Sequence, residues 1–474
     1  MGQNRNGAGE GASVTQRQNS PLSPLDGRYS ALVSDLAEVI SEKALNRARL
    51  EVEVEWLISL TEAGIGNALP IDNPTVTALR ARVTNFSDED VNALAALEAT
   101  TQHDVKAIEY FLRGILDDLG HPELQELCHF AATSEDINNL AYALMLTRAI
   151  HDVWLPQVDA VRSQLADLAV AWREIPMLSR THGQPATPTT FGKELAVFAY
   201  RLGQVLTPLR SLVLPGKFNG ATGTYSAHRV AWPEADWTKI SQRFVENLGL
   251  RWNPLTTQIE SHDGQVAALQ SLHHAGLIAH NLCTDIWTYI SLGYLRQVPQ
   301  KGTTGSSTMP HKINPIRFEN AEANCEIAAG LLVTLQTTLA TSRLQRDLTD
   351  STTQRNIAVA MGHQMVAWKN IQRGLSEIDV DPDRLRGDLE AHPEVLGEAI
   401  QTVIRAEIVA GRSSISDPYD VVKQLTRGKA ITKDTLREFV SGLDIGQGAK
   451  ERLLELTPES YTGLASELVD YLDS

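Results

Sequence analysis

The chain has 474 residues, of which 42% are apolar, so it is long enough for several ordinary domains or for one core of very long helices. Its formal net charge of −16 argues against a nucleic-acid or anionic-membrane partner, because both require a basic face. Three scattered cysteines, without Cys-x-x-Cys or His-Glu-x-x-His spacing, indicate reduced thiols in a cytoplasmic protein and no zinc site.

The beginning of the chain is polar. Residues 1–18 are rich in Gly, Asn, Gln and Ser and lack the apolar stretch of a secretory signal, so residues 1–20 are predicted to be a disordered tail. No run of about 18 apolar residues follows, and no membrane span is expected.

The middle of the chain carries the periodicity of long helices. Apolar residues recur at spacings of three or four, or sums of these, in four segments: 136–172 with a kink expected near Pro156, 191–206, 265–295 and 321–341. Two-residue alternation is scarce. Helices this long with broad apolar stripes must pack in a bundle, within or across subunits, so the sequence predicts an all-α fold.

Two breaks divide this pattern. A Gly-His-Pro break lies within residues 119–122, and an acidic stretch with two prolines spans residues 379–393. We therefore expect an N-terminal helical domain at 21–122, a central long-helix bundle at 123–378 and a C-terminal helical domain at 379–474.

The first segments that could carry chemistry precede the long helices. TTQHD at 100–104 places His103 next to Asp104. In HFAATSEDINN at 129–139, Thr133 and Ser134 stand where a helix N-cap is expected. The amides at such a helix end can also bind a carboxylate or phosphate, and the two roles are compatible.

A third segment, SRTHGQPATP at 179–188, has His182 at its centre. It lies between two long helices, so the sequence suggests that His182 projects into a cavity of the bundle. A lone histidine is more often structural than catalytic, and both roles stay open on this segment alone.

The segment GTTGSSTMPHKINP at 302–315 has few apolar side chains although long apolar helices flank it. Hydroxyls beside Lys312 on a glycine-hinged loop are typical of a lid that closes over an anion. The alternative is a flexible connector, but a connector has no need of His311, Lys312 and Asn314 between prolines. Met309 replaces the second glycine of Gly-x-Ser-x-Gly, so a hydrolase nucleophile elbow is disfavoured.

The last segment, SRLQRDLTDSTTQRN at 342–356, concentrates Arg343, Arg346, Ser351 and Arg355 in an acidic protein. One interpretation is a phosphate clamp, which favours the forked donors of arginine. The other is a solvated helix face with paired charges.

Together these segments resemble the fumarase/aspartase superfamily, whose loop has the form GSSxMPxKxNP; this chain has GSSTMPHKINP at 305–315. Within the superfamily the chain is similar to the bacterial form of the adenylosuccinate lyase family, from about residue 20 to its end. SPLDGRY at 23–29, TTQHDVKAIEYF at 100–111, WNPLTTQIE at 252–260 and the segments quoted above carry this likeness. The departures are the N-terminal tail, Gln102 where Asn is usual, and extra residues near 410–416.

The resemblance implies a three-domain helical fold, release of fumarate from a succinylated nucleotide, no metal or other cofactor, and a homotetramer whose active sites each draw on three subunits. Ser306 would be the base and His182 the acid, with Glu319 orienting it. Lys312 and Asn314 would hold the carboxylates, helped by Thr133 and Ser134. The implied nucleotide pocket comprises Arg28, Tyr29, Gln102, His103, Asp104, His129, Gln258, Asn320, Arg346, Ser351 and Arg355.

This chemistry is physically reasonable. Removal of a proton α to a carboxylate creates extra negative charge, which needs donors placed where it develops. A histidine can protonate the leaving nitrogen because its pKa lies near working pH, whereas a serine is a base only if a closed loop stabilises its alkoxide. The alternatives are another lyase of the superfamily, such as argininosuccinate lyase or aspartase, an inactive structural relative, and a serine hydrolase.

Overall fold

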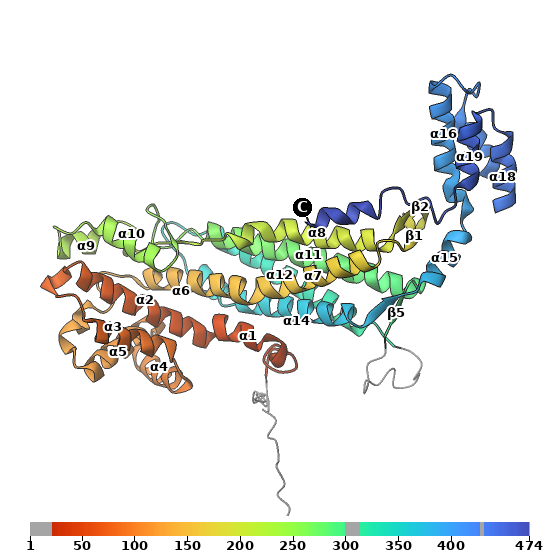
Figure 1. The fold of residues 1–474 in the computed structure, drawn as a ribbon. Helices are drawn as coiled ribbons and strands as arrows, with labels where there is room; N and C mark the ends of the chain where they lie inside the picture. The colour runs from red at the N-terminus through yellow and green to blue at the C-terminus, as the bar shows by residue number, and fades with distance from the viewer. Residues whose placement is uncertain (1–20, 299–312, 427–430, 474) are drawn as a thin grey trace, which may run out of the picture. The chain divides into compact units, whose positions relative to one another are not determined.

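The computed structural model describes residues 21–298, 313–426 and 431–473, and regular structure in these ranges is mainly helical, as predicted. Figure 1 shows the long helices that dominate the fold. They are α6 (Ser134–Arg148), α7 (Leu155–Ala171), α8 (Phe191–Arg210), α11 (Asp263–Leu292), α12 (Ile316–Leu339) and α14 (Ile357–Leu375). Each predicted long segment thus coincides with a helix or, for residues 136–172, with two. In the described part of the chain, no helix is both long and apolar enough to cross a membrane.

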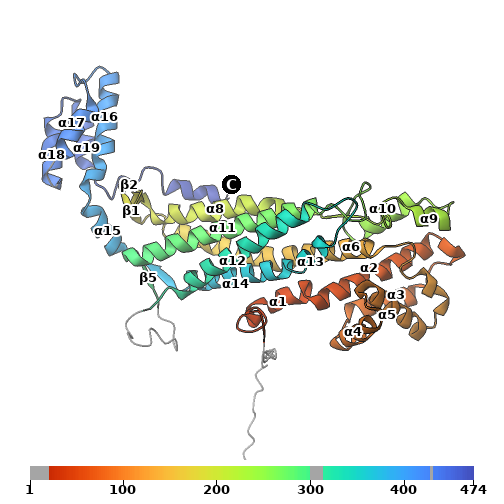
Figure 2. The ribbon, with the colours of Figure 1, turned by 180° about the vertical axis from the view of Figure 1, so that it is seen from behind.

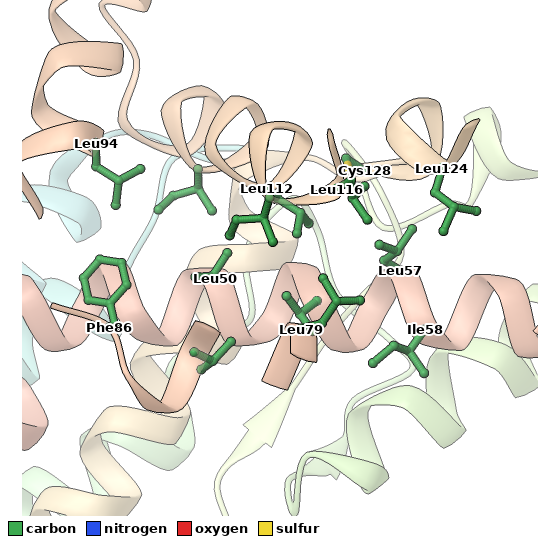
Figure 3. Packing of buried hydrophobic residues seen from close by; sticks show 14 of the residues in the cluster. Leu50, Leu57, Ile58, Leu79, Phe86, Leu94, Leu112, Leu116, Leu124 and Cys128 are labelled. Carbon is green, nitrogen blue, oxygen red and sulfur yellow. The ribbon is translucent and has the colours of Figure 1, made fainter. Parts of the chain in front are cut away.

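The N-terminal helices pack around one apolar cluster. They are α1 (Ser30–Ile40), α2 (Glu42–Glu62), α3 (Asn73–Thr84), α4 (Asp88–Thr101) and α5 (Asp104–Leu119), with short 3-10 turns at Ile65–Asn67 and Pro122–Leu127. Figure 3 shows Leu50 and Leu57 of α2 beside Leu79 of α3 and Leu112 of α5; all four are fully buried. Burial of each such side chain stabilises the fold by about 1.5–3 kcal/mol. Gly120, at φ 80°, ends α5 at the predicted break.

The irregularity expected near Pro156 is a π-helical turn. Residues Ala149–Trp154 form this turn between α6 and α7 and end two positions before Pro156. In a regular α-helix the ring of Pro156 would clash with the carbonyl of Asp152 and would leave it without its hydrogen bond. A π turn changes this hydrogen-bond ladder locally and lets the helical path continue.

Three two-stranded sheets complete the described structure. β1 (Pro176–Thr181) pairs antiparallel with β2 (Gln184–Thr190), β3 (Pro215–Gly216) pairs parallel with β4 (Arg251–Trp252), and β5 (Leu295–Gln297) pairs antiparallel with β6 (Ile378–Val380). The first sheet was not predicted from the sequence. The remaining helices are α9 (Ser226–Ala231), α10 (Trp237–Asn247), α13 (Thr349–Gln354, visible in Figure 2), α15 (Pro382–Glu390), α16 (Gly397–Val409), α17 (Pro418–Thr426), α18 (Lys433–Gly442) and α19 (Gln447–Glu455), with 3-10 turns at Pro393–Leu396 and Glu467–Asp473.

The chain divides into two compact units, each assembled from separate stretches of sequence. Unit 1 contains residues 1–157, 206–277 and 323–369; unit 2 contains residues 158–205, 278–322 and 370–474. Unit 2 has its own apolar cluster near the C-terminus, which includes Leu396, Ile400, Ile404 and Val440. The three consecutive domains expected from the sequence remain a prediction.

Candidate active site

In unit 1, the N-terminus of α6 carries two of the predicted site residues. Thr133 is the N-cap of α6, as expected, and the Asp136 carboxylate accepts its N–H at 3.0 Å. Ser134 follows, and both side chains are half-buried. The first-turn amides of a helix lack intrahelical acceptors, so this end can receive an anion.

His103 lies next to this helix end. It is the N-cap of α5, where its Nδ1 accepts the Lys106 N–H at 3.3 Å, and its Nε2 lies 3.5 Å from the Ser134 hydroxyl. Because Nδ1 is an acceptor, a neutral His103 carries its proton on Nε2 and can donate it to Ser134 or to a ligand.

Gln102 has a left-handed backbone at φ 53°, and its side-chain amide donates to the Ala99 carbonyl at 2.9 Å. Asn adopts this conformation more readily than Gln does, which gives a physical reason for the Asn that is usual in the resembled family. In this chain the amide nitrogen of Gln102 is used within α4.

His129 is bound to a fully buried carboxylate. Its Nδ1 lies 2.6 Å from Glu53 Oε1, and its backbone N–H donates to Glu53 Oε2 at 3.1 Å. Burial disfavours the protonated ring, but the hydrogen bond and charge of Glu53 outweigh it and, with Glu109 and Asp136, raise the pKa of His129. The pair therefore favours a positive charge on His129.

The arginines of the 342–356 segment are all paired with carboxylates of this chain. Arg346 Nη2 lies 2.8 Å from Glu135 Oε1, and its Nη1 donates to Gln258 Oε1 at 3.3 Å. Arg355 Nη1 contacts Glu42 at 2.7 Å, and its Nη2 lies 3.3 Å from Asp104 Oδ2. The arginines are therefore paired, but the pair of Arg346 with Glu135 is 19% and 2% exposed rather than solvated, and the phosphate clamp remains a prediction.

Asp104 connects two arginines. Its Oδ2 also accepts from the almost fully buried Arg49 at 2.7 Å. Burial would raise the pKa of Asp104, but Arg49, the Val105 amide and Arg355 together lower it. Ser351, on α13, is half-buried, and its backbone N–H donates to Asp350 at 2.6 Å.

Arg28 is exposed and Tyr29 is half-buried, immediately before α1. A cavity of about 250 Å³ is lined both by residues of the stretch that precedes them and by Arg355. Its polar lining comprises Ser23, Asp26, Ser41, Glu42, Tyr142, Gln354 and Arg355. Residues from several segments that are far apart in the sequence therefore lie together in this part of unit 1.

In unit 2, His182 lies at the tip of the β1–β2 hairpin and is exposed. His182 and Gly183 both have positive φ, 53° and 74°, as the two central residues of a type I′ turn require. The expectation that His182 projects into a bundle cavity is therefore wrong for this chain alone. A His-Gly pair between two β-capable runs was the sequence signal that could have revealed the hairpin.

Glu319 and Asn320 lie near the N-terminus of α12. Glu319 is exposed and accepts the indole N–H of Trp287 on α11 at 3.1 Å, and Asn320 accepts from the Asn370 amide at 3.0 Å. Among the described residues, no hydrogen bond joins Glu319 to His182. Asn314 is half-buried just before α12. Ser306 and Lys312, with His311, lie outside the described residues, so their roles stay predictions.

The sequence did not reveal the buried charged residues that contact these site residues or one another, namely Arg49, Glu53, Glu135, Asp136 and Lys217. The Thr-x-x-Asp pattern of a capping box at 133–136 could have pointed to Asp136. The partners of the others are distant in sequence, and no local pattern marks them. In the described ranges, no group of three or more His, Cys, Asp or Glu side chains could hold a metal ion.

Comparison with known proteins agrees with this architecture. A lyase family model matches residues 27–330, and an adenylosuccinate lyase C-terminal model matches residues 342–462. The adenylosuccinate lyase of Escherichia coli is 44% identical over 455 residues, which cover 95% of this chain and 98% of that protein. That of Haemophilus influenzae is 44% identical over 453 residues, with the same coverage.

Solved structures agree in fold. A fumarate lyase from Mesorhizobium gives a TM-score of 0.73 at 21% identity, covering 93% of this chain and 97% of that one. A 3-carboxy-cis,cis-muconate lactonizing enzyme from Pseudomonas putida gives 0.72 at 21% identity, covering 93% and 96%. The helical fold and the family match define a lyase of the fumarase/aspartase superfamily. Within this class, the chain belongs to the adenylosuccinate lyase family.

Proposed function

We propose that this chain eliminates fumarate from adenylosuccinate to give AMP, and from succinylaminoimidazole carboxamide ribotide (SAICAR) to give AICAR, in purine nucleotide biosynthesis. The observation that carries this proposal is the 44% identity to adenylosuccinate lyases over 95% of the chain. In both reactions a Cβ–H bond and a C–N bond break, the C=C bond of fumarate forms, and a proton reaches the departing nitrogen.

Proton removal is assigned to Ser306, on the strength of the GSSTMPHKINP match. The proton leaves carbon next to a carboxylate, so negative charge grows on that carboxylate. Lys312, Asn314 and the α6 end at Thr133 and Ser134 are proposed to hold the succinyl carboxylates. The position of Thr133 and Ser134 at the α6 N-terminus supports this assignment, because the amides of a helix N-terminus favour an anion.

His182 is proposed to protonate the leaving nitrogen, with Glu319 tuning it. An exposed position on a hairpin tip fits a residue that completes an active site with another subunit. Large apolar side chains exposed on the long helices also favour self-association: Val170, Val197, Tyr200, Leu277, Trp287, Ile327 and Val333. We therefore propose a homotetramer with active sites shared between subunits.

The nucleotide phosphate is assigned to Arg346, Ser351 and Arg355, with Arg28 and Tyr29 nearby. Phosphate binding would replace the Glu42 partner of Arg355, whereas Arg346 would keep its contact with Glu135 and bind the phosphate with its other donors. The protonated state that Glu53 favours would make His129 a further positive group of the pocket. The rest of the proposed pocket comprises Gln102, His103, Asp104, Gln258 and Asn320.

We place the protein in the cytoplasm, where its three buried thiols would stay reduced. Another fumarate-releasing lyase activity, on argininosuccinate or aspartate, is not favoured, because the C-terminal family model is that of adenylosuccinate lyase. Fumarate release from adenylosuccinate, SAICAR, argininosuccinate and aspartate tests this choice. Release from the first two alone supports the proposal, and release from argininosuccinate or aspartate alone overturns it.

A further inference from the structure

Asp136, in the first turn of α6, is a fully buried carboxylate that binds groups from several directions. The ammonium of Lys217, also 0% exposed, lies 2.8 Å from Oδ1. The N–H groups of Thr133 and Gly220 donate to Oδ2 at 3.0 Å each, and that of Asn219 donates to Oδ1 at 3.0 Å. One carboxylate therefore fastens the α6 end to the 217–220 loop, and Lys217 supplies the charge that its burial requires.

A second series of contacts also joins the 217–220 loop to α6. After Gly220, the Ala221 carbonyl accepts from the Gln258 amide at 3.0 Å. Gln258 Oε1 accepts from Arg346 at 3.3 Å, and Arg346 binds Glu135 at 2.8 Å. Glu135 is the neighbour of Asp136 in the chain. The contacts thus form a closed ring that joins the N-terminus of α6 to Arg346, one of the arginines proposed to bind the phosphate.

We propose that Asp136 and Lys217 are positioning residues for the elimination. Neither reaches the substrate, because both side chains are fully buried. They act through the ring, which fixes the anion-binding end at Thr133 and Ser134 relative to Arg346. The inference rests on the proposed function, in which these two places hold the succinyl group and the phosphate of one substrate.

If Asp136 and Lys217 contributed to stability alone, a folded variant that lacks the ion pair would keep the wild-type kcat. A buried ion pair replaced by neutral side chains of similar volume often leaves stability unchanged or higher. The substitution Asp136→Asn, however, cannot restore the ring. Each carboxylate oxygen accepts at least one backbone N–H, so the new amide nitrogen faces a donor in either orientation. The loop and the helix end would then separate even in a stable variant.

The test compares Asp136→Asn, Lys217→Met and the double variant in the full-length enzyme. Each single variant leaves one buried charge alone, so its urea midpoint falls. The double variant carries neither charge, so its midpoint rises above those of the single variants, although the new amide of Asp136→Asn leaves a buried backbone N–H without an acceptor. Its kcat for fumarate release from adenylosuccinate nevertheless stays about 10²-fold low, as misplacement of binding groups predicts. A double variant with the wild-type kcat overturns the inference.

A matched control lies in unit 2. Glu407 is 3% exposed, binds Arg412, which is 58% exposed, at 2.7 Å and accepts the Gly446 N–H at 3.0 Å, so like Asp136 it is a buried carboxylate with a cationic partner and a backbone donor. The double variant Glu407→Gln with Arg412→Met should keep the wild-type kcat, and an equal loss of kcat there contradicts a specific role for Asp136.

A milder variant keeps the test decisive if the Asp136–Lys217 double variant does not fold. Lys217→Gln removes the charge but retains a donor for the Gly220 carbonyl, which Lys217 now contacts at 3.2 Å. It should show a native circular dichroism spectrum with a reduced kcat, and an unchanged kcat overturns the inference. Wild-type enzyme without fumarate release contradicts the proposed function itself, which separates the two failures.

Discussion

The guanidinium of Arg346 lies 2.8 Å from the carboxylate of Glu135, which is 2% exposed. A residue proposed to bind the substrate phosphate is therefore held in place, before any ligand arrives, by a residue in the first turn of α6. This contact connects the segment at 342–356 with the segment at 129–139, and it would fix the direction from which Arg346 meets an anion.

The variants Arg346→Ala and Arg355→Ala should weaken AMP binding. A charge-assisted hydrogen bond to an anion contributes about 1.5–3 kcal/mol, which corresponds to a loss of roughly 10- to 100-fold in affinity. Isothermal titration with AMP measures this. Arg243→Ala is the control, because Arg243 is 73% exposed and its partner Glu62 is outside the proposed site. Wild-type affinity in both clamp variants would rule out the assignment.

The variant Glu42→Gln should bind AMP more tightly than the wild type. Glu42 is 65% exposed and lies 2.7 Å from Arg355, so its charge competes with the phosphate for the same guanidinium. Exposed ion pairs contribute about 0.2–1 kcal/mol, so a gain of up to roughly fivefold is expected. Glu38→Gln, an exposed neighbour on α1, should leave the affinity unchanged. Weaker binding in Glu42→Gln would mean that Glu42 orients Arg355 rather than competing for it.

The contact between His129 and Glu53 predicts a pH dependence of stability. Because the pKa of His129 is raised on folding, its contribution is fully present below the unfolded pKa of about 6.5 and is lost as pH rises through the folded pKa. The free energy of unfolding, from urea titrations at about pH 6 and about pH 8, should fall more in the wild type than in Glu53→Gln. Glu51 lies on α2 like Glu53 and binds Arg148 of α6, so Glu51→Gln is the control and should keep the wild-type difference. An equal fall in Glu53→Gln would contradict the protonated His129.

The variants Ser306→Ala and His182→Ala should each lose kcat far more than they raise KM, by about 10²–10⁴-fold. Ser307→Ala should lose less than Ser306→Ala, since only one of the two hydroxyls is proposed to act on the Cβ proton. Mixed tetramers of Ser306→Ala and His182→Ala subunits should regain part of the activity, because some shared sites would contain both intact residues. Stable mixed tetramers without recovery would mean that both residues come from one subunit or that one is misassigned.

The sequence predicted the long helices because their apolar residues repeat with helical spacing, as Leu269, Leu272 and Leu282 do in α11. It also located the α6 cap and the irregularity at Pro156, since both depend on neighbouring residues. It did not reveal the contacts of Arg346 and Arg355 with Glu135 and Glu42, which are 211 and 313 positions apart. Such pairs arise from tertiary packing, which no local pattern records.

The central claim is elimination, and the products of adenylosuccinate turnover test it most directly. Proton NMR of the reaction should show fumarate and AMP appearing in equal amounts with wild-type enzyme, and neither at a comparable rate with Ser306→Ala. Hydrolysis of the same C–N bond would instead give malate and AMP, and hydrolysis of the bond between that nitrogen and the purine ring would give aspartate and IMP. Either of these pairs as the products, or no turnover by folded wild-type enzyme, would contradict the account.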